Sequence, residues 1–66
     1  MKNSLKVERA IKNITQEELA REIGVTRQAI NSIELGKYVP STVLALKLSK
    51  FFGKPVNDLF WLEEGD

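Results

Sequence analysis

The segment TRQAINSIELGK, residues 26–37, carries a set of hydrogen-bonding side chains at helical spacing. They are Arg27, Gln28, Asn31 and Ser32. Guanidinium, amide and hydroxyl groups of this kind donate and accept hydrogen bonds at a polar partner surface. None of them forms the pair of nucleophile and neighbouring base that covalent catalysis requires. The chemistry of the segment is therefore recognition rather than bond making.

The composition argues against an enzyme. The chain has no cysteine and no histidine, so it lacks thiolate metal ligands and the commonest general base. Three carboxylates follow one helical face, and we interpret them as a solvated charged surface: Glu17, Glu18 and Glu22. No glycine-rich phosphate loop and no cluster of metal ligands occurs. We expect no catalytic residues, no bound metal and no cofactor.

The 66 residues predict a single small domain, residues 1–66, with 42% hydrophobic and 29% charged residues. A chain of this length buries only about 60% of its unfolded surface, so its stability margin should be thin. No apolar run approaches the roughly 20 residues of a membrane span, and the N-terminus lacks a signal-peptide core. These absences favour a soluble, cytoplasmic protein.

The charges are unevenly distributed although their sum is only +1. All ten Lys and Arg residues and five acidic residues lie within residues 1–57. Residues 58–66 contain only acidic charges, on Asp58, Glu63, Glu64 and Asp66. A basic body with an acidic end is compatible with nucleic-acid binding by the body, and equally with an ordinary solvated surface.

Five helices are predicted from caps and apolar spacing. The first runs from about Leu5 to Asn13, with Val7, Ala10, Ile11 and Ile14 as its apolar stripe. Thr15 and Glu18 form a capping box for a second helix from about Gln16 to Ile23, which Gly24 ends. The third helix is predicted from the cap Thr26 to Gly36, the fourth from the cap Ser41 to about Phe52, and the fifth from Pro55 to about Phe60.

The second and third predicted helices each have one apolar and one polar face. Leu19, Ala20 and Ile23 point inward on the second helix. Ala29, Ile30 and Ile33 do so on the third, opposite the polar side chains of residues 27–32. Small Ala20 lets the two helices cross closely, and Val25 fills the turn between them. This is the shape of a helix-turn-helix, whose second helix can enter a DNA major groove.

The stretch TQEELAREIGVTRQAINSIELGK resembles the helix-turn-helix of the lambda-repressor and Cro type, the XRE family, at residues 16–35. The matching residues are Gln16, Leu19, Ala20, Ile23, Gly24, Val25, Ile30, Ile33, Glu34 and Gly36, followed by Pro40 and Ser41. The resemblance covers about residues 5–60. It implies an all-α, five-helix DNA-binding bundle, double-stranded operator DNA as the ligand, a homodimer, and a role in transcription regulation.

The resemblance also implies which residues contact DNA. Gln16 matches a family position that contacts a backbone phosphate and can support readout, and its place at a helix N-terminus suits it to an anion. The groove-facing positions are Thr26, which caps the helix, and Arg27, Gln28, Asn31 and Ser32. Arginine can pair with guanine, and glutamine or asparagine with adenine. The loop with Lys37 and Tyr38 would lie along the DNA phosphates and position the protein without reading the sequence.

Each of these positions also has a plainer interpretation. Arg27 and Gln28 could be solvated helix residues, Gln16 a first-turn polar residue, and Tyr38 a half-buried lid of its loop. The family often pairs the residues at Arg9 and Glu34 across two helices, and we interpret these two as a structural ion pair.

The C-terminal sequence LFWLEEGD places Phe60, Trp61 and Leu62 in a row. Three consecutive large apolar residues cannot all face one small interior, so this tail, about residues 56–63, is the predicted dimer interface. Some short members of the family end in an antiparallel β element, and Phe60–Glu63 could pair with the residues before Leu5. The alternative is a frayed tail with Trp61 packed on its own domain.

The sequence thus predicts a homodimeric, sequence-specific DNA-binding regulator, a repressor, with no small-molecule ligand. The alternative is an antitoxin-like module that binds a partner protein as well as DNA. RNA binding is disfavoured because the chain lacks an exposed aromatic platform.

Overall fold

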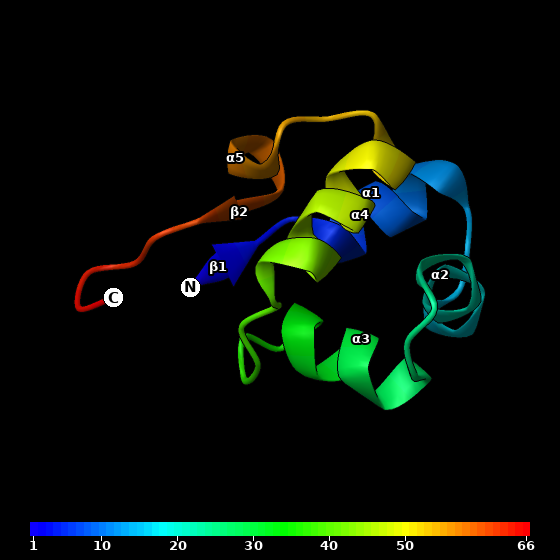
Figure 1. Cartoon of the computed structure of the whole chain (residues 1–66), viewed down its shortest axis with the longest axis horizontal. Helices are drawn as coiled ribbons and strands as arrows, with labels where there is room; N and C mark the ends of the chain where they lie inside the picture. Colours follow the sequence, from blue (N-terminus) through cyan, green and yellow to red (C-terminus); the bar gives the residue numbers. More distant parts are fainter.

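The computed structural model describes residues 1–66 and contains the five predicted helices (Figure 1). Two short strands lie near the ends of the chain. The elements, in chain order, are β1 (Lys2–Asn3), α1 (Leu5–Lys12), α2 (Gln16–Ile23), α3 (Arg27–Glu34), α4 (Thr42–Phe52), α5 (Val56–Leu59) and β2 (Phe60–Trp61). None of the helices is long and apolar enough to cross a membrane.

Three helices begin at a hydroxyl side chain that accepts a hydrogen bond from a backbone amide three residues later. Thr15 caps α2, Thr26 caps α3 and Ser41 caps α4. Such caps each contribute about 1 kcal/mol, because they satisfy amides that the first helical turn leaves free. Gly24 ends α2 and Gly53 ends α4 in left-handed conformations. The predicted caps and glycine ends are confirmed.

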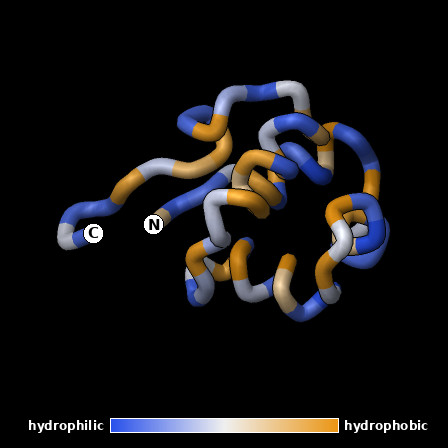
Figure 2. The backbone as a smooth tube through the Cα atoms, viewed as in Figure 1, coloured by the Kyte–Doolittle hydropathy of each residue, from blue (hydrophilic) through white to orange (hydrophobic).

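The core is apolar and draws on all five helices and β2. Its buried residues are Leu5, Leu19, Ala20, Ile23, Ile30, Ile33, Leu44, Leu48, Phe52, Leu59 and Phe60. Hydrophobic residues recur along α4 at the centre of the molecule, and the C-terminal end is hydrophilic (Figure 2). The Phe51 and Phe52 rings meet edge to face with centroids 5.0 Å apart. Among the helices, α2 and α5 pack against α4 most extensively.

The helices α2 and α3 cross at small and branched apolar residues. Ala20 is 3% exposed, and Ile30 is fully buried. Val25, in the turn between the helices, is partly buried against the core. The inward faces predicted for α2 and α3 are therefore confirmed except at Ala29, which is only partly buried and lies outside the core. A methyl side chain at Ala20 permits the close approach that keeps the two helices in a fixed relation.

The orientation predicted for α1 is wrong. Its apolar stripe faces solvent: Val7 is 58% and Ile11 70% exposed, and Ala10 is also exposed. Only Ile14, beyond the helix end, packs against the core. The buried residues of α1 are Leu5 and Glu8. The helix is turned so that charged side chains, rather than the apolar stripe, face the rest of the molecule.

Ionic and cation–π contacts explain this orientation of α1. Glu8 accepts a hydrogen bond from Lys54 Nζ at 2.7 Å, just after α4. Arg9 pairs with Glu34 of α3, and Lys12 Nζ lies 5.3 Å from the centroid of the Phe51 ring. A buried charge is tolerated where it is paired, and no buried side-chain nitrogen or oxygen lacks a partner. The spacing of apolar residues in the sequence gives no information about such pairs.

The two strands join the ends of the chain. Lys2 pairs with Trp61 and Asn3 with Phe60 in an antiparallel ladder, so the predicted β element is confirmed in a shorter form. The amide of Ser4 donates to the carbonyl of Leu59 at 2.9 Å. The C-terminal segment lies at the opposite end of the long axis from α2 (Figure 1).

The orientation of α1 yields a stability prediction. Ile11→Ser should change the free energy of unfolding by less than about 0.5 kcal/mol, because the side chain is already in water. Leu5→Ala, on the buried face, should lower it by about 2–5 kcal/mol. Urea denaturation of the two variants compares them. A loss for Ile11→Ser close to that for Leu5→Ala would contradict the orientation.

Candidate nucleic-acid interface

The outer face of α3 presents most of the polar side chains that the sequence singles out. Arg27, Gln28 and Asn31 are exposed, and Ser32 is partly buried. They share this face because Ile30 and Ile33, on the opposite side, are buried in the core. The core therefore determines which residues of α3 a ligand can reach.

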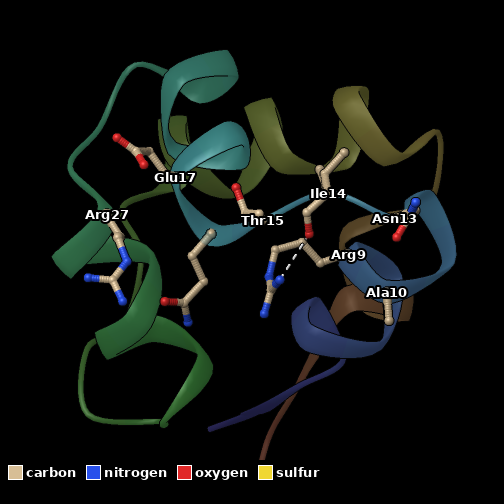
Figure 3. A pocket seen from close by; sticks show the side chains of 8 residues that line it. Arg9, Ala10, Asn13, Ile14, Thr15, Glu17 and Arg27 are labelled. Carbon is tan, nitrogen blue, oxygen red and sulfur yellow. Dashed lines mark hydrogen bonds between the residues drawn. The ribbon is translucent and has the colours of Figure 1, made fainter.

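A hollow of about 580 Å³ lies between the α1–α2 turn and the starts of α2 and α3 (Figure 3). Its lining residues are Arg9, Ala10, Asn13, Ile14, Thr15, Gln16, Glu17 and Arg27. Arg9 and Arg27 reach toward it from opposite sides, with Thr15 between them (Figure 3). The hollow brings Gln16 and Arg27, both predicted to contact the ligand, to one place.

The N-terminus of α2 opens on this hollow with two free backbone amides. Thr15 Oγ1 accepts from the Glu18 amide at 3.0 Å, and Glu18 Oε1 accepts from the Thr15 amide at 2.9 Å. The hydrogen bond that the Thr15 backbone amide donates to the Glu18 carboxylate lowers the pKa of Glu18. The amides of Gln16 and Glu17 make no hydrogen bond within the protein. A helix N-terminus with free amides is suited to an anion such as a phosphate.

The Arg9–Glu34 ion pair closes the inner side of the hollow. Arg9 Nε lies 2.7 Å from Glu34 Oε2, and Arg9 Nη2 lies 3.1 Å from Glu34 Oε1. The Glu34 side chain is only 5% exposed. The hydrogen bonds from Arg9 to Glu34 raise the pKa of the guanidinium, and partial burial of Arg9 opposes this. Arg9 Nη1 also donates to the Ile14 carbonyl at 3.0 Å. One side chain thus holds α1, the α1–α2 turn and α3 together.

The side chain of Gln16 bridges α2 and α3. Its Nε2 donates to Asn31 Oδ1 and to Glu34 Oε1, each at 3.1 Å. Both hydrogens of the amide are therefore used inside the protein. Any contact of Gln16 with a phosphate oxygen must then come from its backbone amide. The sequence did not indicate this bridge.

A second, shallow hollow of about 320 Å³ lies on the other side of α3. It collects five of the predicted contact residues together with Ala29: Thr26, Gln28, Ala29, Ser32, Lys37 and Tyr38. The Ser32 carbonyl accepts from the amides of Lys37 at 2.9 Å and Tyr38 at 3.3 Å, which folds the α3–α4 loop back on the helix. Gly36 permits this turn at a φ of +74°. Tyr38 is 48% exposed.

The fold buries one of the three apolar residues of the predicted dimer-interface tail and exposes the other two. Phe60 is 5% exposed and packs in the core, so it presents almost no surface. Trp61 and Leu62 are 44% and 75% exposed. Beside the tail lies an apolar groove of about 360 Å³, lined by Met1, Val39, Pro40, Thr42, Ala45, Leu46, Val56 and Phe60. No pattern in the sequence predicts this groove, although Leu46 lies outside the buried stripe of α4.

Comparison with known proteins agrees with this arrangement. A family described as helix-turn-helix matches residues 5–59, which include all five helices. An HTH-type transcriptional regulator of Methanocaldococcus jannaschii is 53% identical over 66 residues, the whole of each chain. The HTH-type transcriptional regulator YgzD of Bacillus subtilis is 52% identical over 64 residues, 97% of each chain. Another, of Archaeoglobus fulgidus, is 44% identical over 97% of this chain and 90% of its own.

The ion pair yields a second stability prediction. Arg9→Met should lower the free energy of unfolding by about 3–5 kcal/mol, because it leaves the buried Glu34 carboxylate without a counter-charge. The double variant Arg9→Met, Glu34→Met should lose much less. Chemical denaturation of the two single variants and the double variant gives the coupling energy.

The pair of Glu8 and Lys54 provides a matched control. Lys54→Met should cost less than Arg9→Met, because the Lys54 side chain is 43% exposed. Additive losses at Arg9 and Glu34 would mean that the two charges do not stabilise each other.

Proposed function

The chain belongs to the XRE-type helix-turn-helix family of DNA-binding transcriptional regulators, and from this premise we propose that it is a homodimeric repressor that binds operator DNA sequence-specifically. The single observation that carries the proposal is the outer face of α3, with a hollow on each side. This face combines exposed Arg27, Gln28 and Asn31 on a helix whose apolar side is fixed in the core.

The two hollows suit the two DNA strands that border a major groove. A recognition helix in the groove has phosphates on both sides, and contacts to them position the protein without reading the sequence. The free amides at the start of α2 would meet one strand. Lys37 and Tyr38, in the α3–α4 loop, would meet the other. Arg27, Gln28 and Asn31 are then the base-reading residues, with Ser32 and Thr26 beside them.

The charge distribution supports this placement. The acidic residues 58–66 belong to the segment at the far end of the long axis from α2 (Figure 1). Their repulsion of phosphate is therefore weakest at the start of α2, because salt screens charges more than about 10 Å apart, whereas Glu63 lies beside Leu35 and Gly36 at the start of the α3–α4 loop.

We infer a homodimer from the size of the reading surface. One helix touches too few base pairs to be selective, and proteins of this class place two recognition helices about 34 Å apart on two half-sites. The exposed Trp61 and Leu62, and the apolar groove beside them, are the surfaces we assign to the contact between copies. A dimer covering its operator would exclude other proteins from that DNA, which is the basis for proposing repression.

The alternative function is an antitoxin-like module that binds a partner protein as well as DNA. The observation that favours it is the exposed apolar stripe of α1, made of Val7, Ala10 and Ile11. A gene for a small toxin beside the gene for this chain would support it. Weak DNA binding even at low salt would favour a partner protein over DNA as the main ligand.

Two substitutions should separate base reading from phosphate contact. Gln28→Ala should cost about 1–3 kcal/mol on the best site and relax the preference at one base pair. Lys37→Ala should weaken binding to all sequences alike and reduce the slope of log K against log salt by about one. Titrations of specific and random duplexes at several salt concentrations measure both effects. Equal losses for Gln28→Ala on the two duplexes would remove it from the base-reading residues.

A second pair of substitutions tests the dimer. Trp61→Glu should give a folded monomer that binds a palindromic operator much more weakly, because a buried charge at an apolar interface is costly. Sedimentation equilibrium at micromolar concentration, with DNA titration on the same sample, provides the measurement. Leu46→Glu is the matched variant in the groove. If only Leu46→Glu dissociates the dimer, the contact lies in the groove and the tail is not part of it.

A further inference from the structure

The side chain of Asn3 joins the first strand to the end of α3. Its Nδ2 donates a hydrogen bond to the Ile33 carbonyl at 2.8 Å, and the two residues are 30 positions apart in the chain. Its Oδ1 accepts a hydrogen bond from the Leu5 amide at 3.2 Å. Ser4, directly before α1, makes no side-chain cap, so Asn3 satisfies the first amide of that helix. One side chain therefore bonds the start of α1 and the end of α3.

The two partners of Asn3 determine which end of its amide faces each of them. A backbone carbonyl can only accept and a backbone amide can only donate, so the NH₂ group must face Ile33 and the oxygen must face Leu5. Both hydrogen bonds are partly buried. Aspartate at this position would keep the bond to Leu5 and would place an acceptor against the Ile33 carbonyl. The contact thus requires both a donor and an acceptor on one side chain.

The Ile33 carbonyl also belongs to the turn that ends α3. It accepts from the Gly36 amide at 2.9 Å, and the Ser32 carbonyl accepts from the Lys37 amide at 2.9 Å. With Gly36 in the left-handed conformation, these two bonds form a Schellman motif. A carbonyl oxygen has two lone pairs, and Asn3 uses the second one on Ile33. The side chain is therefore bonded to the turn from which the α3–α4 loop begins.

The backbone near β1 also lies against this turn. A Cβ atom on Gly36 would lie 3.6 Å from the Met1 carbonyl oxygen. A hollow of about 220 Å³ lies at the same contact, and its lining includes Lys2, Gly36 and Trp61. Lys2 and Trp61 are partners in the β1–β2 ladder. The turn that ends α3 is therefore in contact with the ladder, and Asn3 supplies a hydrogen bond between them.

We propose that Asn3 is a positioning residue that holds the start of the α3–α4 loop, and with it Lys37, in place for contact with a DNA phosphate. Lys37 and Tyr38 are both exposed, and their amides bond to α3 only through the Ser32 carbonyl. A loop with so few bonds depends on the turn from which it starts. Asn3 itself needs no contact with DNA. The inference rests on the proposed function, because that function assigns a phosphate to Lys37.

The first experiment measures the loop without DNA. Asn3→Ala should make the Gly36 and Lys37 amides exchange their hydrogens at least about tenfold faster, because the turn opens locally once its support is removed. The amide of Leu48, in the middle of α4, should stay within about twofold of the wild-type rate. Hydrogen exchange followed by NMR gives each amide separately. A rise of equal size at Leu48 would mean a general loss of stability and overturns the inference.

Two further variants separate the bonds of this segment. Asn3→Asp keeps an acceptor for the Leu5 amide and loses the donor to α3, so it should speed exchange at Lys37 as much as Asn3→Ala does. Ser4→Ala is the matched control, because the Ser4 hydroxyl donates to the Asp58 carbonyl on the other side of the segment. It should leave Lys37 within about twofold of the wild-type rate. If Asn3→Asp resembles the wild-type chain, the cap of α1 is the cause and the inference is overturned.

The second experiment measures the phosphate contact. Asn3→Ala adds no charge, yet it should reduce the slope of log K against log salt by up to about one, as Lys37→Ala does. The double variant should have the same slope as Lys37→Ala alone, because both changes remove one contact. Selection of duplexes from a random pool should give the wild-type base preferences for Asn3→Ala. Circular dichroism checks that each variant is folded.

The outcomes distinguish the inference from the proposed function. Unchanged exchange at Lys37 in Asn3→Ala, or slope losses that add in the double variant, overturn the inference while sequence-specific binding stands. A slope that Lys37→Ala leaves unchanged also overturns it, because no phosphate contact is then present to be positioned. Absence of any sequence preference in the wild-type selection overturns the proposed function instead.

Discussion

The guanidinium of Arg9 joins three parts of the chain: α1, the α1–α2 turn and α3. It binds both oxygens of Glu34 on α3 and the Ile14 carbonyl in the α1–α2 turn. A buried pair of this kind adds little net stability compared with apolar side chains of similar size. Its contribution is orientation, because Arg9 reaches Glu34 only when this face of α1 is turned toward α3. The apolar stripe of α1 is exposed as a result, and Glu34 has one oxygen available to Gln16.

The sequence predicts the helices well because their signals are local. Thr15, Thr26 and Ser41 cap the helices that follow them, and Gly24 and Gly53 end two of them through backbone conformations that other residues rarely adopt. The orientation of α1 could not be predicted in this way. It depends on Glu8 meeting Lys54 and Arg9 meeting Glu34, partners far along the chain, and apolar periodicity treats every charged residue as outward.

The candidate site also combines features that local sequence signals predict with features that depend on partners far along the chain. Exposure of Arg27, Gln28 and Asn31 follows from the buried isoleucines on the other side of one helix, which a sequence shows directly. The bond from Gln16 to Asn31 depends on how two helices cross and on the orientation of two amides, so no spacing rule reports it. For a related reason, the sequence leaves open which residues of the C-terminal tail face inward. Whether Phe60 or Trp61 faces inward depends on the register of β1 against β2, which the structure sets by pairing Asn3 with Phe60.

That strand pairing has a consequence for the order in which the chain folds. The helices form from residues a few positions apart, whereas the ladder joins residues 2–3 to residues 60–61 across nearly the whole sequence. Closing so long a loop costs conformational entropy before the stabilising contacts form. Packing of the helices reduces this cost because it brings the two ends of the chain close together. A two-stranded ladder is also marginal by itself. It should be the last part of the molecule to form and the first to open, and the indole of Trp61 lies where fluorescence would detect that opening.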